Sequence, residues 1–510
     1  MNCRIQFLCK TFTVIILFFF HTSISKAQNT KVELINADIL IGDESTDKNL
    51  RRLIGNVQFR HDGTDMYCDS AYFYAEDNSL DAFGIVRMLR GDTISLNSRR
   101  MNYKGNQKIA RVWEDVVLKD KKMTLKTQEL IYDTEQQQAW YETPAVITQS
   151  DNILKSNRGI YQGKESMLYF KENVTLDNPS YTLEADTLLY HIRKETAYFQ
   201  GPTYIQATDK EQSTMYCERG WYNTNNGKSV FRKNAWLQSG VQKLEGDSLL
   251  YDRFAQAGES FGNVLVSDTV QKISIAGDYA YYNKNLRKSS VFGDIILSQK
   301  IDDDTLFMHA DTLFALFDST GRASDYFAYP NARFYKKDIQ GKCDSIAYNS
   351  ADSSMKMFGE PVLWNNNYQL TSNYIQLFME NNKLKSMLMD QAAFIVGEVD
   401  SGYYNQIKGK KMLGFFDNNQ LRQIHVDGNG QSIYYGTNSK KDYIGLNKAE
   451  CSNMIIDVDD NKINRINMIQ TPDAVFKPMN SINDELKFLK GFVWLDYKRP
   501  LNKEDIFNWR

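Results

Sequence analysis

The sequence has 510 residues, of which 42% are hydrophobic and 24% charged, so it is long enough to bury a substantial core. This excludes a short disordered peptide and a small disulfide-stapled one. Only 8 residues are proline while 13% are aromatic, which favours strands over proline-rich linkers and coiled coils. The 61 basic and 63 acidic residues leave no positive excess to bind phosphate backbones, so nucleic acid is not a predicted partner.

Residues 1–27 are predicted to form a signal peptide. Basic residues precede the apolar run from Thr11 to Phe20, and small residues at positions 25 and 27 match a signal-peptidase site. A membrane span needs roughly 20 apolar residues, which this run does not reach, so export with cleavage after Ala27 is favoured over an uncleaved anchor. A lipid-anchored precursor would carry cysteine at the next position, which is Gln28. The mature chain is therefore expected to be soluble.

A short pattern recurs through the rest of the chain. It consists of a small residue, often followed by Asp, then a polar residue, two mostly apolar residues and an aromatic one, as in Ala185–Tyr190 and Gly246–Tyr251. Its sixth position returns every 29 to 33 residues, at Phe73, Tyr103, Tyr132, Tyr161, Tyr190, Tyr222, Tyr251, Tyr282, Ala315, Tyr348 and Leu377. A fixed period of this kind indicates a repeat architecture.

A second landmark keeps step with the first. Twelve residues after the sixth position lies a turn-forming residue, at Asp115, Pro144, Asn173, Pro202, Asn234, Asn263 or Asp294. Val, Ala or Ile follows it in most copies, and Gly55-Asn56-Val57 is one of the fullest versions. Each unit is therefore predicted to run strand, turn, strand, turn. About twelve such units predict an all-β solenoid, because one repeat cannot bury its own apolar face.

Three cysteines, Cys68, Cys217 and Cys343, occupy the small-residue position of the repeat. They lie four or five repeats apart, which at roughly 4.8 Å per strand separates them by about 19 Å or more. A disulfide allows only ~7 Å between Cα atoms. Free, buried thiols are therefore predicted, whereas the state of Cys451 is left open.

The aspartates of the repeat could be mistaken for catalytic or calcium-binding carboxylates. They recur once per unit, at Asp69, Asp186, Asp247, Asp278, Asp311 and Asp344, which is typical of a strand-edge or turn residue. No metal-ligand spacing, P-loop, dinucleotide motif or nucleophile elbow is found. The chain is therefore predicted to be no enzyme and to hold no metal or cofactor.

The aromatic and leucine positions of the repeat should line up along one face of the stack. This predicted inward column comprises Leu130, Tyr132, Leu188, Tyr190, Leu249, Tyr251, Tyr282, Ile346 and Tyr348. Two interpretations stay open. The column is either the packed core of the solenoid or, where two facing sheets do not close, the wall of an apolar trough along the molecule that suits acyl chains.

The export signal, the strand Ala185–Tyr190 and the Gly-Asn-Val turn together resemble the OstA/LptA family of periplasmic lipopolysaccharide-transport proteins, over roughly residues 32–475. The resemblance implies an elongated antiparallel β-jellyroll of V-shaped rungs whose interior holds lipid A acyl chains. It also implies a non-enzymatic bridge between the inner and outer membranes. The implied partners are lipopolysaccharide and other jellyroll components of the bridge, joined by pairing of edge strands.

The predicted layout has four parts. Residues 1–27 are the signal peptide, 28–400 the OstA-like repeats and 401–480 degenerate repeats or a second jellyroll segment. Residues 481–510 form a tail that is expected to hold a short helix and cap the open end of the stack. The predicted location is the periplasm, and association with the outer membrane is left open. Two alternatives remain: a secreted carbohydrate-active enzyme on a parallel β-helix, and a structural surface repeat protein.

Overall fold

The computed structural model describes residues 30–42, 49–208, 212–301, 303–319, 322–381, 383–440, 442–459 and 462–508. The predicted signal peptide lies outside these residues. The chain divides into two compact units. The first consists of Ile131–Glu135 and the described residues up to Leu118, and the second of Lys119–Leu130 and the described residues from Gln136 onward.

The first unit is built of long strands. They are β1 (Glu33–Asn36), β2 (Ile39–Gly42), β3 (Leu50–His61), β4 (Thr64–Tyr74), β5 (Ser79–Arg90), β6 (Ile94–Lys104) and β7 (Ile109–Lys119). Strand β8 (Thr124–Asp133) contributes residues to both units.

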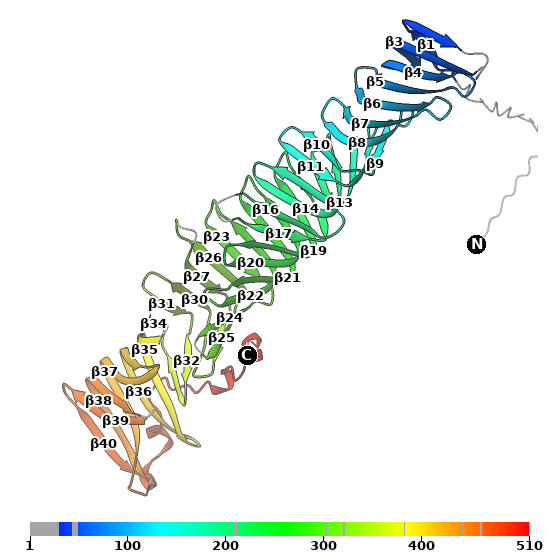
Figure 1. Ribbon diagram of the computed structural model, residues 1–510. Helices are drawn as coiled ribbons and strands as arrows, with labels where there is room; N and C mark the ends of the chain where they lie inside the picture. The colour runs from blue at the N-terminus through cyan, green and yellow to red at the C-terminus, as the bar shows by residue number, and fades with distance from the viewer. Residues whose placement is uncertain are drawn as a thin grey trace, which may run out of the picture. The chain divides into compact units, whose positions relative to one another are not determined.

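The second unit consists of further strands that follow one another through the unit (Figure 1). Its first strands are β9 (Gln138–Tyr141), β10 (Ala145–Gln149), β11 (Asn152–Ser156), β12 (Arg158–Gln162), β13 (Met167–Asn178), β14 (Tyr181–His191), β15 (Thr196–Phe199), β16 (Thr203–Ala207), β17 (Thr214–Cys217), β18 (Arg219–Asn223), β19 (Lys228–Ser239), β20 (Gln242–Asp252), β21 (Ala257–Asp268), β22 (Ile273–Asn283), β23 (Lys288–Phe292) and β24 (Ile296–Ile301). Where a long strand is broken into two short ones, each short strand pairs within its own arm, as β9 does with β12 and β10 with β11.

The later strands complete that unit. They are β25 (Asp304–His309), β26 (Thr312–Phe317), β27 (Ala323–Tyr329), β28 (Ala332–Lys336), β29 (Ile339–Cys343), β30 (Ser345–Asn349), β31 (Ser354–Phe358), β32 (Val362–Asn365), β33 (Tyr368–Thr371), β34 (Tyr374–Glu380), β35 (Lys383–Asp400), β36 (Tyr403–Asp417), β37 (Gln420–Thr437), β38 (Tyr443–Asp459), β39 (Lys462–Ile469) and β40 (Asp473–Pro478).

The strand pairings among the described residues are antiparallel throughout, as in β3 with β4, β13 with β14 and β37 with β38. The helices there are short 3₁₀ turns, namely η1 (Met479–Ser481), η2 (Asp484–Leu486), η3 (Asp496–Lys498) and η4 (Glu504–Phe507). The predicted all-β, antiparallel repeat fold is therefore confirmed. A parallel β-helix, which one of the alternatives required, does not agree with these pairings.

Most long strands bend at a β-bulge near their middle. In β3 the residues Gly55 and Asn56 have positive φ, and the pairing with β4 skips from Ile54 to Val57. In β19 the residues Lys233 and Asn234 leave the ladder in the same way. A bulge bends its strand and increases the local twist. Each long strand is thereby divided into two arms that meet at a corner.

The second landmark of the repeat marks these corners, which corrects the prediction of a turn between separate strands. Asn263 lies inside β21, between register positions Phe261 and Val264. The chain reverses elsewhere, for example at residues 253–256, directly after the repeat's aromatic position. Residues that favour turns also tolerate the positive φ of a bulge, so sequence alone does not separate the two. At Pro144 and Pro202 the missing N–H breaks the strand outright.

The recurring aspartates hold the corners in place, which agrees with the structural role predicted for them. Asp247 Oδ2 accepts a hydrogen bond from Asn263 Nδ2 at 2.9 Å, and Asp69 Oδ2 accepts one from the Ile85 N–H at 2.8 Å. The carboxylate lies so close that a Cβ at Gly262 would stand 2.4 Å from Asp247 Oδ2. The aspartate of the motif and the turn-forming residue twelve positions after its aromatic residue therefore contact each other, as Asp247 and Asn263 do.

Asp186 shows how the corner changes the strand's alternation. Strict alternation along β14 would place Asp186 on one face with Leu188 and Tyr190, yet the aspartate is exposed while the other two are buried. The pairing between β13 and β14 skips Asp186, because it stands opposite the bulge of β13. Strict alternation therefore fails at the aspartate.

The four cysteines of the described chain are buried, and none is bonded to another. This confirms the prediction for Cys68, Cys217 and Cys343, and it shows that Cys451 is a free thiol too. Burial raises the pKa of the Cys68, Cys217 and Cys343 thiols to about 12. Protonated thiols of this kind are inert packing groups.

The C-terminal tail covers one face of the second unit. Neighbouring residues of β35 point to opposite faces: Ile395 belongs to the main core, whereas Phe394 and Val396 form a second core with Leu489 of the tail. Trp494 packs against this second core as well. The tail therefore lies on the face opposite the main core.

Buried glutamines fix the path of the tail. Gln369 donates to the Val493 carbonyl at 2.8 Å and accepts from the Leu495 N–H at 2.6 Å. Gln406 repeats this two-way contact with the Lys487 carbonyl and the Leu489 N–H, at 2.7 and 2.8 Å. Further along, Gln340 Oε1 accepts from Arg499 Nε at 2.8 Å. The tail thus runs back along β36, β33 and β29 in turn.

Candidate functional site

The second unit encloses a cavity of 2380 Å³ between the arms of its strands. Residues from Pro179 to Asn419 line it. The apolar part of the lining comes mainly from Leu244, Leu249, Val266, Ile275, Leu297, Leu306, Met308, Leu313, Phe334 and Ile346. We refer to this cavity as the trough.

The trough is hollow because its inward side chains do not meet across it. Leu244, Val266 and Ile275 point inward but are only partly buried. In the earlier strands of the same unit, Leu125, Leu154 and Leu183 are completely buried. The same fold is therefore packed solid in one stretch and hollow in another. The two interpretations that the sequence left open therefore each describe one stretch: the earlier strands are packed core, and residues from 179 to 419 line a cavity.

The residues paired with the repeat's aromatic position differ between the two stretches. In the packed stretch Tyr190 pairs with Leu168 and Ala197, and both are buried. In the hollow stretch Ser229 and Gly258 both pair with Tyr251. A serine or a glycine fills much less space than a leucine, so the arms stay apart.

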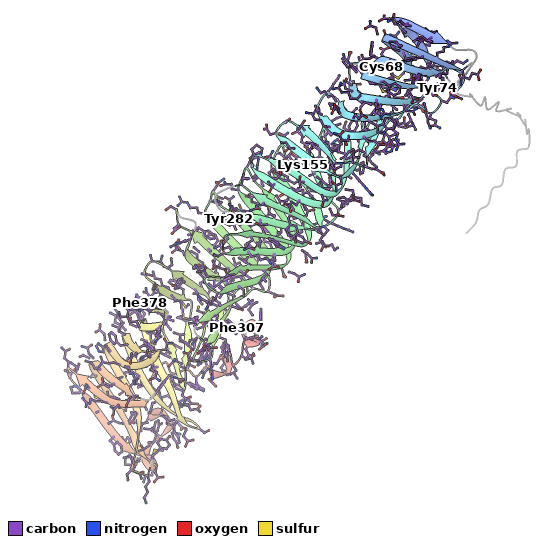
Figure 2. All side chains as sticks on the ribbon, in the orientation of Figure 1. Cys68, Tyr74, Lys155, Tyr282, Phe307 and Phe378 are labelled. Atoms are coloured by element: carbon purple, nitrogen blue, oxygen red, sulfur yellow. The ribbon has the colours of Figure 1, made fainter. Side chains whose placement is uncertain are left out.

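The predicted inward column divides between the two stretches. Leu249, Tyr251, Tyr282, Ile346 and Tyr348 line the trough, and Tyr282 is labelled in Figure 2. The other four, Leu130, Tyr132, Leu188 and Tyr190, are buried in packed strands and do not line it. Lipid binding by any of these residues stays a prediction.

Side chains close the mouth of the packed stretch, where the loops at the ends of the two arms face each other. Tyr161 donates to Asp120 Oδ2 at 2.7 Å. Gln149 donates to the Ile192 carbonyl at 3.0 Å, in a buried contact. Along the trough, Tyr326 donates to Gln271 Oε1 at 3.4 Å. The first unit has a similar contact, 2.7 Å between His61 Nδ1 and the Tyr103 hydroxyl.

Two tyrosines close the end of the trough nearest the packed strands. The rings of Tyr181 and Tyr222 meet edge to face with centroids 5.0 Å apart, and both residues line the trough. They are only 4% and 7% exposed, and neither hydroxyl has a hydrogen-bond partner among the described residues. Burial raises the pKa of both phenols. Sequence reasoning missed Tyr181, because it lies outside the repeat's aromatic position.

Chemically, the trough is suited to hold apolar chains, because most of its lining is apolar. Among the described residues, no group of three or more His, Cys, Asp or Glu side chains is placed to hold a metal ion.

A search for helical membrane spans gave none: no helix within the described ranges has the length and hydropathy to cross a bilayer.

Comparison with known proteins gives a family match for part of the chain. Residues 29–186 match the family described as OstA-like protein, which confirms the predicted resemblance over that part of the chain. Among solved structures, one similar chain is LptH of Pseudomonas aeruginosa, described as the LptA homologous periplasmic component of the lipopolysaccharide transport device. It is 15% identical, with 23% of this chain and 82% of that chain covered and a TM-score of 0.21. No curated protein matches the sequence.

Proposed function

We propose that this protein is a non-enzymatic, periplasmic binding protein of the lipopolysaccharide-transport type, which shelters acyl chains in its trough. The observation that carries the proposal is the 2380 Å³ apolar cavity of the second unit. The match of residues 29–186 to OstA-like proteins supports it. Signal-peptide cleavage after Ala27 belongs to the same proposal.

The physical basis is the cost of exposing acyl chains to water. Burial of each methylene group is worth about 0.8 kcal/mol, so a twelve-carbon chain gains roughly 10 kcal/mol on leaving water. Half-buried inward residues such as Ile275 and Leu297 would gain as well, because the chain would cover them. An apolar space of this size between the two arms of the strands is therefore a favourable site for lipid.

We expect lipid to enter along the side of the trough. The packed strands before Pro179 leave no space through which a chain could be threaded lengthwise, since Leu125, Leu154 and Leu176 are completely buried. A lipid would instead enter between the two rows of loops at the mouth. Passage further along the packed strands would require those strands to open.

Bridging of the two membranes through other jellyrolls is the finer part of the proposal. The exposed apolar residues of β1 and β2, among them Ile39 and Leu40 at 52% and 53%, favour pairing at that edge. In the second unit, β40 exposes Val475 and Phe476, at 48% and 51%. These strands are the surfaces on which partner strands would add.

Site-specific photo-crosslinking in cells tests the proposal. A photo-reactive amino acid replaces Ile275 or Leu297 in the trough, and Ile153, which is 40% exposed on a packed strand, serves as the control. We expect lipopolysaccharide adducts at the two trough positions and none at the control. Adducts at all three positions, or at none, would contradict lipid binding in the trough.

A further inference from the structure

Four consecutive loops at the mouth of the trough each expose one large apolar residue. The loops are residues 240–241, 253–256, 269–272 and 284–287, which join the strands from β19 to β23. Their exposed apolar residues are Val241, Phe254, Val270 and Leu286, at 45%, 60%, 71% and 59%. Single exposed apolar side chains are common on protein surfaces. Four in successive neighbouring loops form a cluster, which is typical of a contact surface.

The four loops lie side by side in two pairs, one pair on each arm. The Thr269 N–H donates to the Val241 carbonyl at 3.2 Å, and the Lys284 N–H donates to the Gln256 carbonyl at 2.9 Å. Loops 240–241 and 269–272 belong to one arm and the other two loops to the opposite arm. All four contribute residues to the lining of the trough. The exposed apolar residues therefore stand on both sides of the mouth.

Hydrogen bonds within the loops fix the position of the exposed residues. In three of the loops, a side-chain oxygen of the last strand residue accepts a hydrogen bond from the backbone N–H of the apolar residue. These contacts join Asp252 to Phe254 at 3.0 Å, Asp268 to Val270 at 3.0 Å and Asn283 to Leu286 at 2.8 Å. Turns of this kind are locally stabilised. The loops therefore present their apolar side chains in a defined conformation.

The same loops are positively charged. They contain four cations, Arg253, Lys272, Lys284 and Arg287, and no carboxylate. The Arg253 guanidinium lies 5.1 Å from the centroid of the Phe254 ring, so a cation and an exposed apolar side chain occupy the same place. The whole chain, in contrast, has 61 basic and 63 acidic residues. The four loops are therefore both the apolar and the cationic part of the mouth.

The corresponding loops of the packed strands have neither property. They are residues 150–151, 163–166, 179–180 and 192–195. Three of them contain a carboxylate, and the large aliphatic residue among them, Ile192, is only 1% exposed. Because both sets of loops belong to the same repeat, the fold does not require exposed apolar residues at the mouth. Their presence beside the hollow strands calls for a partner.

An anionic bilayer surface fits both properties of these loops. Apolar side chains enter the head-group region of a membrane, while neighbouring lysines and arginines contact the lipid phosphates. An acidic protein surface would account for the cations, but it would leave the apolar residues on both sides of the mouth without a function.

We propose that these four loops dock the mouth of the trough on an anionic membrane surface. Val241, Phe254, Val270 and Leu286 enter the head-group region, and the four cations contact lipid phosphates. The inference goes beyond the proposed function and does not depend on it, because docking needs the loops and not an occupied trough. It assigns the bilayer itself as a partner and turns the mouth toward the lipid.

Co-sedimentation with vesicles tests the docking. The purified mature protein is mixed with vesicles of phosphatidylcholine alone, or of equal parts phosphatidylcholine and phosphatidylglycerol. We expect about tenfold tighter binding to the mixed vesicles, and weaker binding as the salt concentration rises. Phe254→Ser/Leu286→Ser and Lys272→Gln/Arg287→Gln should each weaken binding to the mixed vesicles by about tenfold.

Matched double variants in the packed stretch serve as controls. Ile153→Ser/Ile160→Ser removes two apolar residues that are 40% and 38% exposed on packed strands. Lys164→Gln/Lys194→Gln removes two exposed lysines from loops of the packed strands. Circular dichroism establishes that each variant folds. Both controls should bind the mixed vesicles as the original chain does.

A second assay measures the trough separately. Dodecyl maltoside displaces a fluorescent apolar dye from the purified protein, and its dissociation constant is determined. Phe254 and Leu286 do not line the trough, so Phe254→Ser/Leu286→Ser should keep this affinity. If dodecyl maltoside fails to displace the dye from the original chain, the proposed function fails, whereas the vesicle assay still decides the docking.

The vesicle assay has two results that would overturn the inference. The first is no binding to the mixed vesicles, or an equal loss of binding in the loop variants and their controls. The second is a loss in Lys272→Gln/Arg287→Gln but none in Phe254→Ser/Leu286→Ser, which would show that the loops contact an anionic surface, such as an acidic protein, without entering a bilayer. In either case lipid binding in the trough stands if the dye is displaced.

Discussion

Within the second unit, the packed strands up to β15 and the hollow strands from β19 to β34 use the same repeat to opposite effect. Leu188 and Tyr190 belong to the same motif as Leu249 and Tyr251, yet the first pair is buried in a filled core and the second borders the trough. Tyr190 pairs with Leu168 and Ala197, whereas Tyr251 pairs with Ser229 and Gly258. The loss of one large side chain at this position therefore accompanies the change from a filled core to a cavity.

Truncation of an inward leucine should show this difference most strongly. Leu183→Ala in the packed stretch should lower the free energy of unfolding by about 2–5 kcal/mol, because it leaves a cavity in a filled core. Leu297→Ala should cost less than about 1.5 kcal/mol, since that side chain already borders open space. Urea unfolding measures both values. Equal losses would contradict the distinction between packed and hollow strands.

Filling the trough should remove its capacity to bind. Tryptophan at two neighbouring trough positions on the paired strands β23 and β26, in the variant Ser289→Trp/Ala315→Trp, should weaken dodecyl maltoside binding by about tenfold or more, since the rings occupy the ligand's space. Dye displacement measures the loss. The control is Thr182→Trp, at an exposed position outside the trough. Unchanged affinity in the filled variant would place the ligand elsewhere.

Removal of a hydroxyl should cost stability at a hydrogen-bonded tyrosine of the mouth but not at an unpartnered tyrosine. Tyr161→Phe removes the hydrogen bond to Asp120 and should lower the free energy of unfolding by about 1–2 kcal/mol. Tyr132→Phe removes a hydroxyl without a partner among the described residues, so stability should stay the same or rise slightly. Thermal unfolding of the two variants distinguishes them. A larger loss in Tyr132→Phe would refute the role assigned to the mouth contacts.

The smallest effect is expected in the first unit and depends on pH. Lys108 Nζ contacts Asp62 Oδ2 at 2.7 Å and, as the largest cause, lowers the pKa of that carboxyl. A lowered pKa in the folded state adds stability above the carboxyl's ordinary pKa, and this stability is lost as the pH falls through the lowered value. Asp62→Asn should therefore cost less than about 1 kcal/mol at neutral pH.

Unfolding of that variant and the original chain at several pH values provides the measurement. The two stabilities should converge in acid, where the native carboxyl is protonated. A difference that persists unchanged in strong acid would show that the ion pair is not its source.

The repeat made the fold predictable from the sequence. The extent of the trough could not be predicted in this way. Spacing alone separates Cys68, Cys217 and Cys343, so their free state could be inferred. The position of the corners could not, because Asn263 suits a bulge as well as a turn. Whether the arms close depends on contacts between distant residues, such as Gln149 with Ile192, which a repeat pattern does not specify.

The tyrosines at the closed end of the trough were equally hidden in the sequence. Tyr181 lies outside the aromatic position of the repeat. A linear pattern does not show that its hydroxyl is buried at the end of a cavity without a partner among the described residues.

The most direct test of lipid binding is a crystal structure of the mature protein with dodecyl phosphate. We expect the dodecyl chain in the trough, against Leu249 and Ile275. A chain bound among the packed strands β10 to β14, or a trough closed by collapse of its two arms, would contradict lipid binding in this cavity.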